Sequence, residues 1–105
     1  MKKIPHEIID FVIKNKAFPE DMLKEKTAII MTQEWCPQWK AMKKWVTGIK
    51  DVAIYVHVYD DTSEFKEFKE KNWNDKIPYV RYYKDGKFIC DSNYLSKEEF
   101  LKRFE

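Results

Sequence analysis

The residue with the clearest chemical potential in this 105-residue chain is Cys36, which lies in the segment Trp35-Cys36-Pro37. It follows an apolar run and precedes a stretch of helix-forming residues, so the sequence predicts a helix N-terminus there. Pro37 suits the first helical turn, where no N–H donor is needed. The free N–H groups and the positive end of the helix dipole stabilise a thiolate. Lys40, one turn on, adds a positive charge, and Trp35 is expected to shield one side of the sulfur.

Cys90 is the other of the two cysteines in the chain. It falls in a predicted strand after the turn at Gly86 and is a possible resolving thiol for Cys36. The interpretation as a small, buried core residue is favoured over that role. Two cysteines exclude a disulfide-dense scaffold, and no four-ligand Cys/His cluster is present for a structural zinc. The sequence therefore predicts no metal site and no cofactor.

His57 is interpreted as a sheet histidine rather than a ligand, because it alternates with Tyr55 and Tyr59 in a strongly β-forming stretch. His6 has no evident partner in the sequence. The acidic pair at 60–61 is interpreted as the lead-in to a helix rather than as a metal site.

The composition describes a single globular domain. Hydrophobic residues make up 44% of the chain and charged residues 36%, which excludes wholesale disorder. The 20 basic and 18 acidic residues give a net charge of +2, a balance that argues against nucleic-acid binding. No apolar run approaches a membrane span and no signal-peptide core follows Met1. We therefore expect a cytoplasmic protein without membrane contact, in which thiols stay reduced.

Hydrophobic periodicity predicts the elements that position Cys36. The first 26 residues are predicted to be helical, with Ile4, Ile8, Phe11 and Val12 at helical spacing. Beyond them the expected order is β-α-β-α-β-β-α, with strands at 27–32, 52–59, 79–83 and 88–91 and helices at 38–46, after 60–63 and from 96 on. A parallel start followed by an antiparallel hairpin indicates an α/β fold: a mixed sheet of about four strands with helices on both faces.

Three segments resemble the thioredoxin superfamily. Residues 29–40 resemble that family's strand followed by W-C-x-x-C-K, residues 77–87 resemble its cis-proline loop and hairpin, and residues 95–100 resemble the start of its final helix. The resemblance covers about residues 27–105. It implies one thioredoxin-like domain over 1–105, with 1–26 as a helical N-terminal extension.

The resemblance also implies roles for individual residues. Cys36 takes the place of the family's attacking cysteine, and Pro78 takes the cis-proline position beside it. The backbone of Ile77 is then expected to pair with an extended substrate strand, as in other β-augmentation contacts.

Two departures from the family pattern remove its dithiol cycle. Trp39 replaces the second motif cysteine, which in the family resolves the mixed disulfide. Ile30 replaces the buried acid that assists proton transfer to that cysteine. The C-G-F-S motif of monothiol glutaredoxins with iron–sulfur function is also absent.

Two functions remain open. The preferred hypothesis is a monothiol thiol–disulfide oxidoreductase, in which Cys36 exchanges with a protein or low-molecular-weight disulfide and an external thiol releases the adduct. The alternative is a redox-inactive binding module that uses an exposed Trp35/Trp39 pair and cis-Pro78. The oligomeric state is not predicted. The residues expected to form the substrate surface are Trp35, Pro37, Trp39, Ile77 and Pro78, with Lys40 tuning the thiolate.

Overall fold

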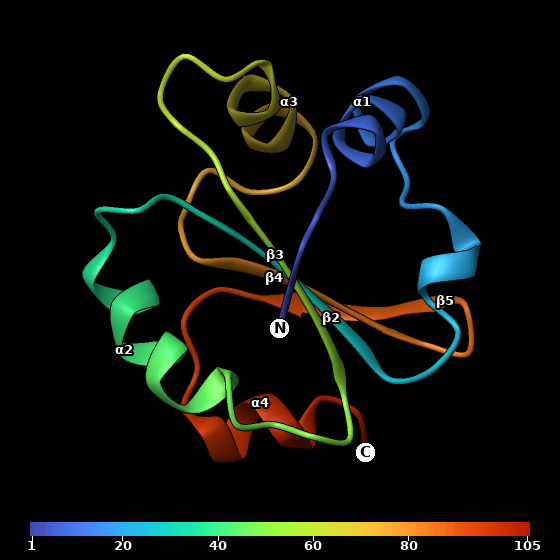
Figure 1. Cartoon of the computed structure of the whole chain (residues 1–105), viewed down its shortest axis with the longest axis vertical. Helices are drawn as coiled ribbons and strands as arrows, with labels where there is room; N and C mark the ends of the chain where they lie inside the picture. The colour runs from blue at the N-terminus through green and yellow to red at the C-terminus, as the bar shows by residue number, and fades with distance from the viewer.

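A five-stranded mixed sheet forms the centre of the computed structural model, which describes residues 1–105 (Figure 1). The strand order is β1-β3-β2-β4-β5. β3 pairs in parallel with both β1 and β2, whereas β4 runs antiparallel to β2 and to β5. The strands are β1 Lys2–Lys3, β2 Thr27–Thr32, β3 Ala53–Val58, β4 Tyr79–Lys84 and β5 Lys87–Ser92.

Helices cover both faces of this sheet, as the sequence predicts. Figure 1 shows α1 and α3 on one side and α2 and α4 on the other. None of the helices combines the length and the apolar character needed to span a bilayer. The helices are α1 His6–Asn15, α2 Pro37–Val46, α3 Glu64–Asn72 and α4 Lys97–Lys102, with a 3-10 turn, η1, at Glu20–Met22.

Local sequence signals fix where the later elements begin. Ser63 caps α3 by accepting a hydrogen bond from the Phe65 N–H at 3.1 Å. Ser96 caps α4 by accepting a hydrogen bond from the Glu99 N–H, and its hydroxyl donates to the Glu99 carboxylate. Between β4 and β5, Gly86 has φ 81, a left-handed conformation that glycine adopts without steric cost.

Two separate hydrophobic clusters lie on the two faces of the sheet. β2 contributes to both, because successive strand residues point to opposite faces. Ala28 and Ile30 pack in the cluster under α2 and α4, whereas Ile29 and Met31 pack in the cluster under α1 and α3. All residues of β2 are buried, as expected for an apolar strand at the centre of a sheet.

The N-terminal quarter differs in part from the expectation. Its main helix is present as α1, and Ile9 and Val12 on it are buried. The sheet has five strands rather than about four, because Lys2 and Lys3 pair in parallel with β3 and the Ile4 N–H donates to the Val56 carbonyl at 3.1 Å. Residues 1–26 thus contribute a strand to the sheet and a helix to the core.

Candidate functional site

Cys36 lies at the N-cap of α2, with Pro37 in the first turn. The loop is closed by backbone hydrogen bonds on both sides of the cysteine: its N–H donates to the Gln33 carbonyl at 3.2 Å, and its carbonyl accepts from the Lys40 N–H at 3.1 Å. The thiol is free, and the residue is only 3% exposed. Cys36 therefore stands at a helix N-terminus and is almost fully buried.

The two tryptophans beside Cys36 are not an exposed pair, and this expectation was wrong for Trp39. Trp35 is 62% exposed, but Trp39 is 4% exposed and belongs to the same hydrophobic cluster as Cys36. α2 begins only at Pro37, so Trp35 lies outside the helix and the i, i+4 spacing does not place the two on one face. Trp39 instead shares the buried face of α2 with Met42.

The Ile77–Pro78 peptide bond is cis, and the loop around it is held by side chains. The Asn93 amide donates to the Pro78 carbonyl at 3.1 Å, and the Asn74 side-chain oxygen accepts from the Lys76 N–H at 2.7 Å. Between these two points, neither the N–H nor the carbonyl of Ile77 makes a hydrogen bond within the protein. Free backbone groups in a loop that leads directly into β4 are available to pair with an extended segment of another chain.

A hollow of about 610 Å³ joins the motif helix to this loop. Gln38, from the first turn of α2, lies on one side, and Ile77 and Tyr94 lie on the other. Cys36 is not among the lining residues, but Ile77 packs against the cluster that contains Cys36. The full lining is Gln38, Asp75, Lys76, Ile77, Asn93 and Tyr94.

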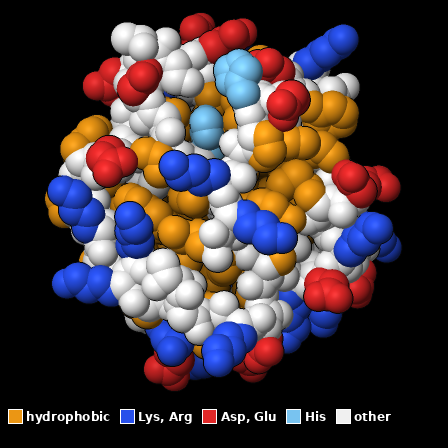
Figure 2. Space-filling model, viewed as in Figure 1, with side chains coloured by type: hydrophobic (Ala, Val, Ile, Leu, Met, Phe, Trp, Pro, Cys, Tyr) orange, Lys and Arg blue, Asp and Glu red, His pale blue; other side chains and the backbone are white.

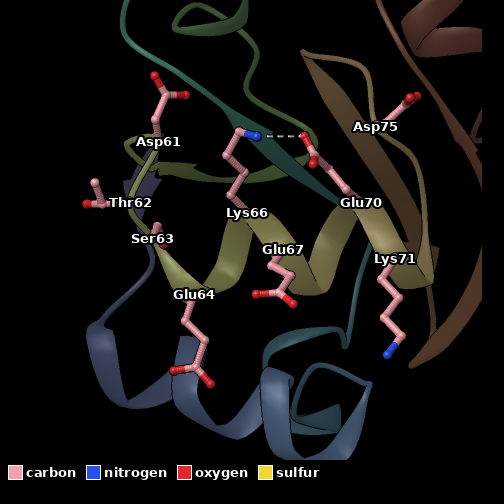
Figure 3. Close-up of a pocket in the computed structure, with 9 residues that line it drawn as sticks. All are labelled: Asp61, Thr62, Ser63, Glu64, Lys66, Glu67, Glu70, Lys71 and Asp75. Carbon is pink, nitrogen blue, oxygen red and sulfur yellow. Dashed lines mark ion pairs between the residues drawn. The ribbon is translucent and has the colours of Figure 1, made fainter.

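A second hollow, of about 760 Å³, lies along α3 (Figure 3). Every side chain that lines it is polar, and Lys66 forms an ion pair with Glu70, one turn further along α3, at 3.1 Å. It connects to the Cys36 loop through Asp61, whose carboxylate accepts a 2.8 Å hydrogen bond from the buried Gln33 amide. This hollow flanks the cysteine loop, and Cys36 is not among its lining residues.

Tyr59, just after β3, lies within electrostatic reach of the cysteine. Burial raises the pKa of Tyr59 above its usual value, and the negative charges of Glu70, Asp61 and the Cys36 thiolate raise it further. The phenol is therefore neutral at physiological pH.

The remaining candidates lie as follows. Cys90 is half-buried in the middle of β5, opposite Tyr82. The Lys40 side chain is exposed on α2. His57 packs edge-on against Phe65 at 4.9 Å between ring centroids, and burial lowers its pKa to about 4, with the charge of His6 adding to this effect. No group of three or more His, Cys, Asp or Glu side chains is placed to hold a metal ion.

Sequence reasoning missed the polar residues that hold the cis-proline loop. Asn74 and Asn93 carry no sequence pattern that predicts their mutual hydrogen bonds. Lys69 does carry a signal, since it occupies the position one turn after Phe65 and next to Phe68, on the apolar face of α3. A lysine on the apolar face of an amphipathic helix is unusual and marks a site to inspect.

Charge is mixed over the surface. Figure 2 shows acidic and basic side chains interspersed on the face it presents, with hydrophobic atoms between them. This distribution agrees with the small net charge of +2.

Known proteins resemble this chain in their fold but not detectably in their sequence. No protein-family model matches the chain, and the search of curated proteins found no match. Thioredoxin O2 from Arabidopsis thaliana superposes with a TM-score of 0.65 at 14% identity, over 96% of this chain and 88% of that one. The short form of spinach chloroplast thioredoxin f gives 0.66 at 13%, over 96% and 87%.

A third similar chain comes from a structural study of thiol resolution in yeast mitochondrial 1-Cys peroxiredoxin by the glutathione and thioredoxin systems. It superposes with a TM-score of 0.66 at 18% identity, over 97% of this chain and 91% of that one. The protein described here therefore has the thioredoxin fold, and residues 1–26 fall largely within the region that superposes.

Proposed function

We propose that this protein is a monothiol thiol–disulfide oxidoreductase that acts through Cys36. The observation that carries the proposal is the placement of a free thiol at the N-cap of α2, in the hydrophobic cluster against which the cis-proline loop packs. The thioredoxin fold supports it at the level of redox chemistry in general.

The reaction is an exchange in two steps. The Cys36 thiolate attacks one sulfur of a disulfide, a Cys36–sulfur bond forms, and the other sulfur leaves as a thiolate. An external thiolate, from a small thiol or a partner cysteine, then attacks the mixed disulfide and returns Cys36 as a thiolate. The external thiol becomes part of the new disulfide, so no further oxidant is needed.

The substrate is held by backbone pairing in this proposal. The unbonded N–H of Ile77 donates to, and its carbonyl accepts from, the backbone of an extended substrate segment that carries the disulfide. Trp35, at 62% exposure, and Pro37 border the approach, while Pro78 is buried and fixes the loop. The helix N-terminus and Lys40 stabilise the thiolate. Trp39 packs beneath the cysteine and supports it rather than touching substrate.

The need for an external thiol suits a reducing compartment, so we place the activity in the cytoplasm. Cys90 is assigned no part in release. Its position opposite Tyr82, in the middle of β5, suits packing against the cluster under α2 and α4.

A second function is favoured by one specific observation. Cys36 is only 3% exposed, whereas Trp35 beside it is 62% exposed. A buried thiol is poorly placed for disulfide exchange, whereas an exposed aromatic side chain can contact a partner. This combination suits a redox-inactive binding module of the same fold. In this alternative Trp35 and the Ile77 backbone bind a partner, and Cys36 serves only as packing.

Mass spectrometry after mixing the reduced protein with a peptide disulfide separates the two functions. The oxidoreductase predicts an adduct within minutes at pH 7, present in Cys90→Ser and absent in Cys36→Ser. The binding module predicts peptide association by both variants without any adduct. The matched serine substitutions keep the side-chain size, so folding differences do not confuse the result.

A further inference from the structure

Lys69 is the one charged side chain among the buried residues, at 0% exposure. It lies on the face of α3 that packs against the sheet, with Phe65 and Phe68. No carboxylate forms an ion pair with it. A buried, unpaired ammonium is costly, and an apolar side chain of similar length is expected to be tolerated as well or better. Core packing alone therefore does not account for a lysine at this position.

The Lys69 ammonium has one hydrogen-bond partner. It donates to the carbonyl of Lys76 at 2.7 Å, and it lies over the rings of Tyr59 and Tyr79 at 5.9 and 5.7 Å from their centroids. The aromatic faces offset part of the lost hydration. Lys76 directly precedes Ile77, so the only polar contact of the buried charge is with the cis-proline loop.

This contact is the third point at which the loop is held. Asn74 accepts from the Lys76 N–H, and Asn93 donates to the Pro78 carbonyl. Side chains thereby hold the N–H and carbonyl of Lys76 and the carbonyl of Pro78. The N–H and carbonyl of Ile77, which lie between them, stay unbonded. A loop held in this way presents its free groups in one orientation and loses little entropy when a strand pairs with them.

We propose that Lys69 is a positioning residue, which holds the Lys76 carbonyl so that Ile77 is oriented to pair with an extended polypeptide disulfide. The inference rests on the proposed function and narrows its substrate class. Polypeptide disulfides benefit from the positioned loop, whereas small disulfides that lack a backbone do not.

The experiment compares the second-order rate constants of Cys36 with two disulfides, a short uncharged peptide disulfide and bis(2-hydroxyethyl) disulfide. In Lys69→Met, the peptide rate is expected to fall about tenfold, the range expected for loss of one hydrogen bond to a charged group. The rate with the small disulfide is expected to change by less than about twofold. Lys71→Met, on the exposed side of the same helix, is the matched control and leaves both rates unchanged.

A measurement on the unmodified protein avoids any folding defect of the variant. The pKa of Lys69 is lowered to about 8, mainly by burial. The negative charges of Glu70 and Asp75 raise it, and the positive charge of Lys66 lowers it, by smaller amounts. The ratio of peptide to small-disulfide rates is therefore expected to fall above pH 8 and to stay flat in Lys69→Met. The rings of Tyr59, just after β3, and Tyr79, at the start of β4, face the ammonium. Both phenols have raised pKa values and stay neutral in this range. Ionisation of Cys36 cancels in the ratio.

The outcomes separate the two proposals. If the unmodified protein reacts with neither disulfide, the proposed function is wrong and the positioning role falls with it. If Lys69→Met loses both rates equally or neither, or if the rate ratio is independent of pH in the unmodified protein, the role of Lys69 alone is overturned. A selective, pH-dependent loss with the peptide supports both.

Discussion

The two faces of the sheet hold the two halves of the candidate site by different means. On the face of α2 and α4, Cys36 is held by apolar packing with Trp39 and Met42. On the other face, Lys69 reaches the cis-proline loop through a hydrogen bond, supported by aromatic rings. The thiol is fixed by close packing, which tolerates no loss of volume. The loop is fixed by directional polar contacts, so its orientation depends on the individual donors and acceptors that make them.

The largest effect is expected where packing holds the site. Trp39→Ala removes a buried indole and is expected to cost about 3–5 kcal/mol of unfolding free energy, measured by urea denaturation. Trp35→Ala is the matched control, with an expected change within about 0.5 kcal/mol because the side chain is 62% exposed. Equal effects of the two substitutions would contradict the placement of Trp39 in the core.

A smaller effect is expected where hydrogen bonds hold the loop. Asn93→Ala leaves the Pro78 carbonyl and the Asn74 side chain without their partner, at an expected cost of about 1–3 kcal/mol in the same assay. Asn15→Ala is the control, since its amide donates only to the exposed Phe11 carbonyl. A loss no greater than that of the control would show that the loop does not depend on Asn93.

The smallest effect at pH 7, and one of the opposite sign, is expected at Lys69. Its folded pKa of about 8 lies below the unfolded value of 10.5, so the unfolded chain binds more protons between these values. Stability therefore rises with pH in that window, and the cost of the buried charge is fully present below pH 8. Lys69→Met is expected to match or exceed the stability of the unmodified protein at pH 7.

The pH dependence of stability in the unmodified protein and in Lys69→Met gives the control for this prediction. Between pH 7 and 9.5, the unmodified protein is expected to gain stability relative to Lys69→Met in urea denaturation. This range ends below the titration of Tyr59 and Tyr79, whose raised pKa values lower stability only at higher pH. A stability difference that stays constant across the range would mean that Lys69 is not a buried charge.

The sequence predicted the parts of this molecule that local patterns control. The strand at 27–32, the Ser96 N-cap and the turn at Gly86 lie where expected, because each signal acts within a few residues. The placement of Cys36 at a helix N-terminus followed from the same kind of signal, with Pro37 in the first turn.

The parts that depend on distant contacts were missed. β1 consists of Lys2 and Lys3, which have no strand pattern of their own and pair only because β3 offers an edge. Burial of Trp39 depends on which face of α2 packs on the sheet, a tertiary contact that the i, i+4 spacing of Trp35 and Trp39 does not describe. The contact of Lys69 with Lys76 depends on how α3 packs on the sheet, which periodicity does not describe.

The central claim is that Cys36 is an attacking thiol without a resolving partner in the chain. The most direct test is to form the mixed disulfide with a peptide, remove excess peptide, and follow the adduct by mass spectrometry without added thiol. We expect the adduct to persist for hours and to be released within minutes once glutathione is added. Spontaneous release accompanied by a Cys36–Cys90 disulfide would contradict it, since Cys90 would then be the resolving thiol.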